Sequence, residues 1–278
     1  MLASMSAMVK VASDRGIHLA EIIFWRQGMT IPMAIAWVMA TSSISALGTR
    51  RPWMHAKRGL YGVAGMVLNF SGVILLPLAE ATTFSFTAPI FAVILSALLL
   101  SEQVGKYRWA AVALGFVGVL IIAQPGGGQI PLLGASVAMG GAFMIALISI
   151  QVADLNRTDE PLTIVFWFAA FTTPLAAIFL PFVMTTHSPF EWVLLISIGV
   201  IGGFGQLLLT ASLRFGQVAS VIVMDYSALV WATLYGWLIW DTLPPVWTWV
   251  GAPLIVAAGM VIAWREHGLA RPVKTPAV

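Results

Sequence analysis

The chain has 278 residues, of which 60% are hydrophobic and 9% are charged, and its formal net charge is +3 at pH 7. A soluble domain carries roughly 25% charged residues, so this chain lacks the polar side chains that a water-facing surface needs. Cysteine is absent and the four histidines show no ligand spacing, so disulfides, thiol catalysis and a zinc or iron motif are excluded. We therefore expect no metal and no cofactor.

The apolar segments predict an all-α membrane protein. Each stretch near 20 residues can cross a bilayer core of about 30 Å as a helix. Breaks at Gly, Pro and charge clusters place nine spans at residues 20–47, 59–77, 80–101, 107–124, 131–153, 160–184, 190–213, 217–240 and 246–264. The apolar segment before them contains Lys10 and lacks a basic leader, so a signal peptide fits poorly. It predicts the second half of a first helix truncated at its start, which makes ten transmembrane helices.

The basic residues predict the orientation. With a cytoplasmic N-terminus and ten alternating helices, eleven of the 14 basic residues fall in cytoplasmic segments, and Arg58 is counted among them. This excess follows the positive-inside rule, so both termini are expected in the cytoplasm. The same flanking pattern explains the positive charge better than nucleic-acid binding, and we expect no nucleic-acid partner.

An internal repeat divides the chain. The dipeptide "FW" at 24–25 recurs at 166–167, and the similar segments that end at Glu102 and Asp241 lie 139 residues apart. The constant spacing near 140 predicts two five-helix repeats, residues 1–126 and 127–266, followed by a cytoplasmic tail, residues 267–278. An odd number of helices inverts the second repeat, an arrangement typical of secondary transporters with a midplane site. An old duplication that stabilises a pore or receptor is the alternative.

Three segments carry a family resemblance. "EIIFWR", "PLAEATTFSFTAPIFAVILSALLLSE" and "MDYSALVWATLYGWLIW", in a five-plus-five arrangement, resemble the EamA-type drug/metabolite transporter superfamily over essentially the whole chain. The resemblance implies a multi-pass carrier of the bacterial inner membrane that moves a small organic metabolite such as an amino acid, riboflavin, a nucleoside-like compound or S-adenosylmethionine. It also implies a central cavity lined by helices one, three, four, six, eight and nine. Proton or counter-substrate coupling and a homodimer are compatible with it.

Asp225 is the strongest candidate for substrate contact or proton coupling, because an ionisable residue inside a span is costly. It lies about eight residues into the predicted ninth helix, followed by Tyr226 and, further along, Trp231. An acid, a phenol and an indole suit an amphipathic organic substrate. The alternative is a packing carboxylate that neighbouring hydroxyls satisfy.

Four further polar residues occupy equivalent positions in the two repeats. Lys10 and Gln151 predict a midplane pair, and Asn69 and Gln206 lie near the middles of the predicted third and eighth helices. An amide in lipid needs partners, so the two amides are expected to face the bundle interior. Contact with substrate and contact with another helix both remain open. The glycines of "YGVAGM" and "GVIGGFG" predict close packing of the same two helices.

Glu80 and Arg26 form the last candidate group. Glu80 either complements the dipole of a helix N-terminus within reach of water, or acts as an outer-gate carboxylate paired with Arg26. Thr83 and Thr87 follow as candidate substrate contacts. Together with Ser85 they recur at every second residue, so at most two of the three can point into one cavity.

Two classes of function remain in competition. The leading one is a secondary carrier, since "GGGQIP" lacks the lysine of an ATP-binding loop. The alternative is an integral-membrane enzyme that acts on lipid, which would need clustered acids and histidines or a G-x-S-x-G elbow, and the sequence has neither. The modest internal charge favours an amphipathic or aromatic substrate over a phosphorylated one, which would call for more than one Lys or Arg on the midplane helices.

Overall fold

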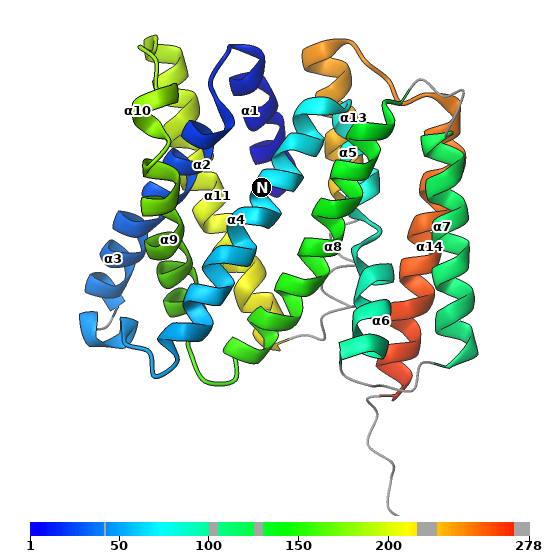
Figure 1. The fold of residues 1–278 in the computed structure, drawn as a ribbon, viewed down its shortest axis with the longest axis horizontal. Coiled ribbons are helices and arrows are strands. Elements are labelled where there is room, and N and C mark those ends of the chain that lie inside the picture. Colours follow the sequence, from blue (N-terminus) through cyan, green and yellow to red (C-terminus); the bar gives the residue numbers. More distant parts are fainter. Residues whose placement is uncertain (42, 100–104, 125–129, 216–226, 270–278) are drawn as a thin grey trace, which may run out of the picture.

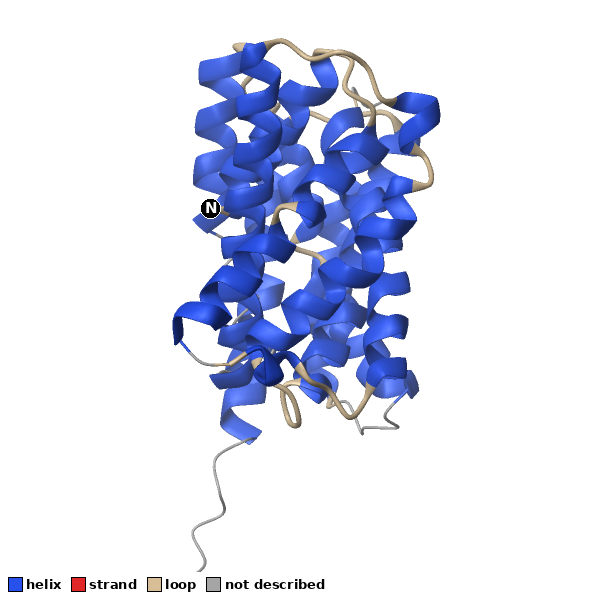
Figure 2. Cartoon of the chain, turned by 90° about the vertical axis from the view of Figure 1, so that its left-hand side faces the viewer, coloured by secondary structure: helices blue, strands red, loops and turns tan. Residues whose placement is uncertain are grey.

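The computed structural model describes residues 1–41, 43–99, 105–124, 130–215 and 227–269. Within these ranges the chain contains helices and no strand. The long helices run side by side and form one bundle, with short connections at its two ends (Figures 1 and 2). The N-terminus lies midway along the height of this bundle (Figure 1).

The helices follow one another in the order expected for a chain that crosses a membrane repeatedly. They are α1 (Leu2–Asp14), α2 (Leu19–Gly28), α3 (Thr30–Thr41), η1 (Ile44–Leu47), α4 (Pro52–Leu75), α5 (Leu78–Ser85), α6 (Ala88–Leu99), α7 (Lys106–Ala123), α8 (Leu132–Leu155), α9 (Pro161–Ala177), α10 (Leu180–Val183), α11 (Pro189–Phe215), α13 (Ser227–Trp240) and α14 (Val246–Leu269).

Seven helical segments within the described residues are long and apolar enough to span a membrane. α9 and α13 are shorter apolar helices. The protein is therefore a multi-pass helical membrane protein, as the composition predicted. The predicted span at residues 217–240 falls partly outside the described residues, which resume at Ser227.

The start of α4 differs from the prediction. The sequence placed the span at residues 59–77, whereas α4 begins at Pro52. Proline is favoured at the first helical position because its missing N–H has no partner there in any case. As a result Arg58 lies in the second turn of a membrane helix, where only 3% of its surface is exposed. The sequence counted it in a cytoplasmic segment, and the structure shows it as a buried helix residue.

The predicted span at residues 80–101 is broken in the middle. α5 ends at Ser85 and α6 begins at Ala88. Pro89 has no N–H to donate to the carbonyl of Ser85, so an unbroken helix is disfavoured here. The hydroxyl of Thr87 donates a hydrogen bond of 2.7 Å to the carbonyl of Phe84, which gives this carbonyl a partner at the break.

Glycines allow close approach of the helix pairs that build the bundle. α7 and α14 lie side by side (Figure 1), and a Cβ on Gly118 would come within 2.8 Å of the carbonyl oxygen of Gly251. α4 and α8 meet in the same way, with Gly72 against Ala138. Such small-residue contacts are typical of membrane helices. In "GVIGGFG", Gly199 packs against Met29 of the α2–α3 junction.

Polar side chains connect the helix ends on both sides of the bundle. At the basic end, Arg51 pairs with Asp154 at 2.6 Å and His55 contacts Asp159 at 2.9 Å, which ties α4 to α8 and the turn after it. At the opposite end, Glu21 of α2 and His187, just before α11, lie 2.5 Å apart. Asp14 accepts a hydrogen bond from the indole of Trp240 there, at 2.7 Å.

Candidate functional site: a central cavity

A cavity of about 220 Å³ lies between the helices. Its walls come mainly from α1, α4, α5, α8 and α11, with single residues from α2, α6, α9 and α13. In the order of the predicted spans, the main lining helices are the first, third, fourth, sixth and eighth. These are five of the six helices that the family resemblance implied, and the sixth, α13, contributes only Ala228 among the described residues.

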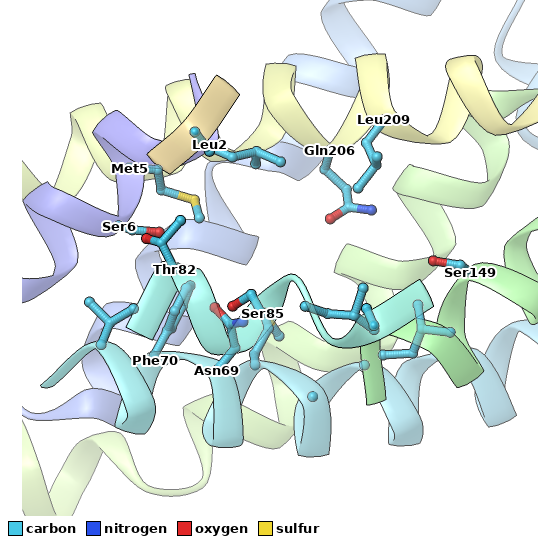
Figure 3. A pocket seen from close by; sticks show the side chains of 18 of the residues that line it. Leu2, Met5, Ser6, Asn69, Phe70, Thr82, Ser85, Ser149, Gln206 and Leu209 are labelled. Carbon is cyan, nitrogen blue, oxygen red and sulfur yellow. The ribbon is translucent and has the colours of Figure 1, made fainter. Parts of the chain in front are cut away.

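The wall of the cavity is mostly apolar, with a few polar groups directed into it. Asn69 of α4 and Ser85 of α5 lie next to each other, and Gln206 of α11 points in from the opposite side (Figure 3). Thr82 and Ser149 add two hydroxyl groups. An apolar cavity with few polar groups is the usual form of a small-molecule site.

Asn69 and Gln206 therefore face the bundle interior, as predicted. Gln206 accepts a long hydrogen bond, 3.4 Å, from Nη2 of Arg26, and its own Nε2 reaches Thr210 at 3.5 Å. Asn69 lies where α4 contacts Gly141 of α8. The structure thus brings together the two amides that the repeat related.

Arg26 lines the cavity and is only 5% exposed. Its Nη1 donates to Oε1 of Gln27 at 2.6 Å, and its Nε and Nη1 contact the sulfur atoms of Met5 and Met66 at 3.3 and 3.1 Å. All of these partners are neutral. The pairing of Arg26 with Glu80 considered from the sequence is therefore not observed.

Arg58 is a cavity residue that the sequence reasoning missed. Its guanidinium lies 4.0 Å from the centre of the Phe168 ring, and its Nε and Nη1 are buried without a hydrogen-bond partner in the described part of the chain. The available signal was the spacing in "RGLYG": Arg58 and Gly62 are four residues apart and share one helix face. A predicted helix that began at Pro52 would have placed Arg58 on the inward face.

Glu80 and Lys10 lie at the edge of this region. Glu80 is 1% exposed, so the expectation that it is within reach of water is wrong. Its Oε1 is 3.4 Å from the Thr248 hydroxyl. Lys10 donates to the carbonyls of Val73 and Leu76 at 2.9 and 2.7 Å and so satisfies the C-terminal end of α4. Its hydrogen-bond partners do not include Gln151, whose Oε1 is buried without a partner among the described residues.

Thr83, Thr87 and Trp231 do not line the cavity. Thr83 and Thr87 are buried and donate to the backbone carbonyls of their own segment, at 2.8 and 2.7 Å. Trp231 is 51% exposed and lines a second hollow of about 380 Å³ between α1, α11 and α13. Asp225 and Tyr226 lie outside the described residues.

A family model matches most of the chain. The model of the EamA-like transporter family matches residues 1–124 and again residues 132–264. Together these matches include every described residue that lines the cavity.

Several curated proteins are similar over nearly the whole chain. The pseudopaline exporter CntI of Pseudomonas aeruginosa strain UCBPP-PA14 is 29% identical over 266 residues, covering 95% of this chain and 92% of that protein. The riboflavin transporter of Vibrio cholerae is 30% identical over 259 residues, covering 88% and 86%. The S-adenosylmethionine uptake transporter of Rickettsia prowazekii is 27% identical over 255 residues, covering 90% and 84%.

A solved crystal structure resembles the fold with a TM-score of 0.69 and 21% sequence identity, covering 98% of this chain and 96% of that chain. At this identity the match concerns the fold alone. The two matches of the family model and the near full-length relatives carry the assignment: this chain belongs to the EamA-like transporter family and is a small-molecule transporter, not an enzyme.

Proposed function

We propose that the protein is a secondary active transporter that moves a small organic metabolite across a bacterial inner membrane by alternating access. The observation that carries this proposal is the central cavity, which is lined from both segments that match the family model. A site shared by two such segments can be opened to one side and then to the other when the segments move. Membership of a transporter family displaces the lipid-acting enzyme considered from the sequence.

We infer a ten-helix inverted repeat from the helix spacing. α2 begins at Leu19 and α9 begins at Pro161, which is 142 residues later, and α3 and α10 end at Thr41 and Val183, again 142 residues apart. The two successive matches of the family model support the same division. An odd number of helices in each half would invert the second half relative to the first.

The ion pairs at the two ends of the bundle are candidate gates. We propose that Arg51 with Asp154 helps to close the cytoplasmic side, and that Glu21 with His187 helps to close the outer side. The first pair joins α4 to α8, and the second joins α2 to the segment before α11. The abundance of basic residues at the first end supports its cytoplasmic position.

Within the site, we propose that Asn69 and Gln206 contact the substrate, because both line the cavity. Lys10, which contacts the end of α4 beside the cavity, and the buried Glu80 are candidates for proton coupling, as is Asp225 on sequence grounds. Coupling to a counter-substrate and a homodimeric state are compatible with the same architecture.

Reconstitution tests the transport function directly. Purified protein in liposomes is assayed for uptake of radiolabelled riboflavin, S-adenosylmethionine, amino acids and nucleosides, with and without an imposed proton gradient. A carrier shows counterflow, in which unlabelled substrate inside the vesicle accelerates uptake of the label. Protein-dependent uptake that shows no counterflow and keeps rising in proportion to the substrate concentration would indicate a channel and contradict the proposal.

A further inference from the structure

We propose that the substrate is a small organic anion whose carboxylate or phosphate group is bound by Arg58 and Arg26. This inference rests on the proposed transport function, because it assigns a substrate class to the same cavity. It departs from the sequence-based expectation of a substrate with little charge. Two guanidiniums line the cavity, whereas the sequence suggested a cavity poor in basic groups.

Arg58 carries most of the argument. It is 97% withdrawn from solvent, with 3% of its surface exposed, and it lines the cavity without a hydrogen bond or ion pair to any described residue. Removing a charged group from water without a partner is costly. The face of Phe168, 4.0 Å away, holds the guanidinium in place but leaves its N–H donors free.

The packing around Arg58 fixes the guanidinium at this position. A Cβ on Gly62 would overlap both Nη1 of Arg58 and Cε2 of Phe168. The guanidinium therefore occupies the space over Gly62 that a larger residue would fill. A donor group held in place before binding loses little freedom when a ligand arrives, and this raises affinity.

Arg26 supplies the second positive charge. Its hydrogen-bond partners are the amides of Gln27 and Gln206 and the thioethers of Met5 and Met66, all of which are neutral. Arg26 and Arg58 line the same cavity. Because their charges have the same sign, each makes the other more costly in the empty cavity.

No aspartate or glutamate is among the described residues that line the cavity. Several described acids have other partners: Glu21 contacts His187, Glu80 contacts Thr248, Asp154 pairs with Arg51, and Asp159 contacts His55. Two arginines facing an apolar cavity without an acid match an oxyanion, since the guanidinium fork binds carboxylate and phosphate through two parallel hydrogen bonds.

The rest of the cavity wall indicates the polarity of the rest of the ligand. Along α4, Arg58 and Asn69 are eleven residues apart, which is about 16 Å at a helical rise of about 1.5 Å per residue. Between these polar positions the wall includes apolar residues such as Ile148 and Leu209, and Arg26 lies along it beside Met66. We therefore infer a ligand with an oxyanion at one end, an apolar middle and a hydrogen-bonding group at the other end.

Thermal unfolding with charged and uncharged ligand pairs tests the proposal. The purified protein is heated with phenylacetate, glutarate or phenyl phosphate, and in parallel with phenylacetamide, glutaramide or phenol, at equal ionic strength. At least one anion is expected to raise the Tm while its uncharged counterpart does not. If none of the three anions raises the Tm more than its counterpart, the proposal is overturned. The three anions also distinguish one carboxylate, two carboxylates and a phosphate.

Variants of Arg58 locate the effect. Arg58→Gln is expected to weaken anion binding by roughly 30-fold or more, the effect of removing one partner from a buried charge pair, and Arg58→Lys by less. The matched control is Arg214→Gln, which removes a guanidinium from a solvent-exposed pair with Glu160 and should leave anion binding unchanged. Equal anion binding by Arg58→Gln and the parent protein would overturn the proposal.

The stability of the ligand-free variant gives an independent readout. Because Arg58 has no hydrogen-bond or ion-pair partner among the described residues, Arg58→Gln is expected to have a Tm equal to or above that of the parent. A marked fall in Tm would assign Arg58 a structural partner and contradict the proposal. Counterflow with the bound anion separates the two proposals. If the anion binds but is not transported, the proposed transport function is contradicted and the inference about charge stands. If neutral compounds are transported and no anion binds, only the inference about charge is contradicted.

Discussion

Gly62 lies directly beneath the guanidinium of Arg58, one turn further along α4, and the missing side chain of the glycine is what makes room for it. Phe168 of α9 closes the other side, with its ring centre 4.0 Å from the guanidinium carbon of Arg58. The position of the charge in the cavity is therefore set by a glycine and an aromatic ring from different parts of the chain.

Gly62→Ala is expected to displace the guanidinium of Arg58 and the ring of Phe168 and so to weaken anion binding. The overlap costs about 1–3 kcal/mol, as overpacking usually does, and it outweighs the gain in helix propensity of about 1 kcal/mol. Binding titrations and thermal unfolding check this. Gly140→Ala in α8, where the nearest atom would be 3.5 Å away, is the matched control and should bind normally. A fully active, stable Gly62→Ala would refute this account.

Gly118→Ala is expected to destabilise the protein by about 1–3 kcal/mol. Its new Cβ would meet the backbone oxygen of Gly251 at 2.8 Å, and backbone cannot rotate away as a side chain can. Unfolding in detergent measures the difference. Gly28→Ala, with its nearest contact at 3.8 Å, should change stability little. Equal stability of the two variants would mean that α7 and α14 can separate at no cost.

Lys10→Met is expected to lower the free energy of unfolding by about 1.5–3 kcal/mol, the usual contribution of hydrogen bonds to a charged group. The variant leaves the carbonyls of Val73 and Leu76 without their donor. The control is Lys57→Met, because the side chain of Lys57 is exposed on the surface of the same bundle. Unchanged stability with loss of gradient-driven uptake would instead make Lys10 a coupling residue.

Asn69→Leu is expected to weaken substrate binding about tenfold, which corresponds to one hydrogen bond of about 1.4 kcal/mol. Asn69 lines the cavity, whereas the equally polar Thr83 donates to the carbonyl of Ala79 instead. Thr83→Val should therefore bind substrate normally with a slightly lower Tm. Uptake measured over a range of substrate concentrations distinguishes the two. If Thr83→Val weakened binding more than Asn69→Leu, the substrate would lie against the face of α5 that carries Thr83.

Asp225→Asn tests a hypothesis that comes from the sequence alone, since Asp225 lies outside the described residues. If Asp225 carries a coupling proton, the variant should lose uphill uptake and keep counterflow. If Asp225 binds substrate, both activities should fall. Uphill uptake and counterflow at parental rates would exclude both roles.

Much of this protein could be predicted from its sequence because a bilayer imposes simple constraints on it. Apolar stretches must become helices that satisfy their own backbone hydrogen bonds, so the spans, and with them the helical membrane fold, follow from composition. The facing of Asn69 and Gln206 towards the interior was predicted for the same reason, since an amide in lipid needs a partner. The family followed from three short segments.

The errors have equally physical causes. The start of α4 was missed because a cluster of basic residues resembles a loop, and a helix that continues through such a cluster cannot be told from a loop by charge alone. One of the two interpretations of Glu80 placed it near water because its position at a helix start permits that. Its burial against Thr248 depends on α14, which is distant in the sequence.

The sequence by itself determined that this chain crosses a membrane as helices and that it resembles a family of carriers, and it predicts a repeat at a spacing near 140. Only the tertiary structure decided which polar groups share the cavity, because that depends on the rotation of each helix and on contacts between distant segments. Arg58 shows the difference most clearly. Its charge was plain in the sequence, but its burial without an acid was set by Gly62 and by Phe168, which the folded bundle brings to it.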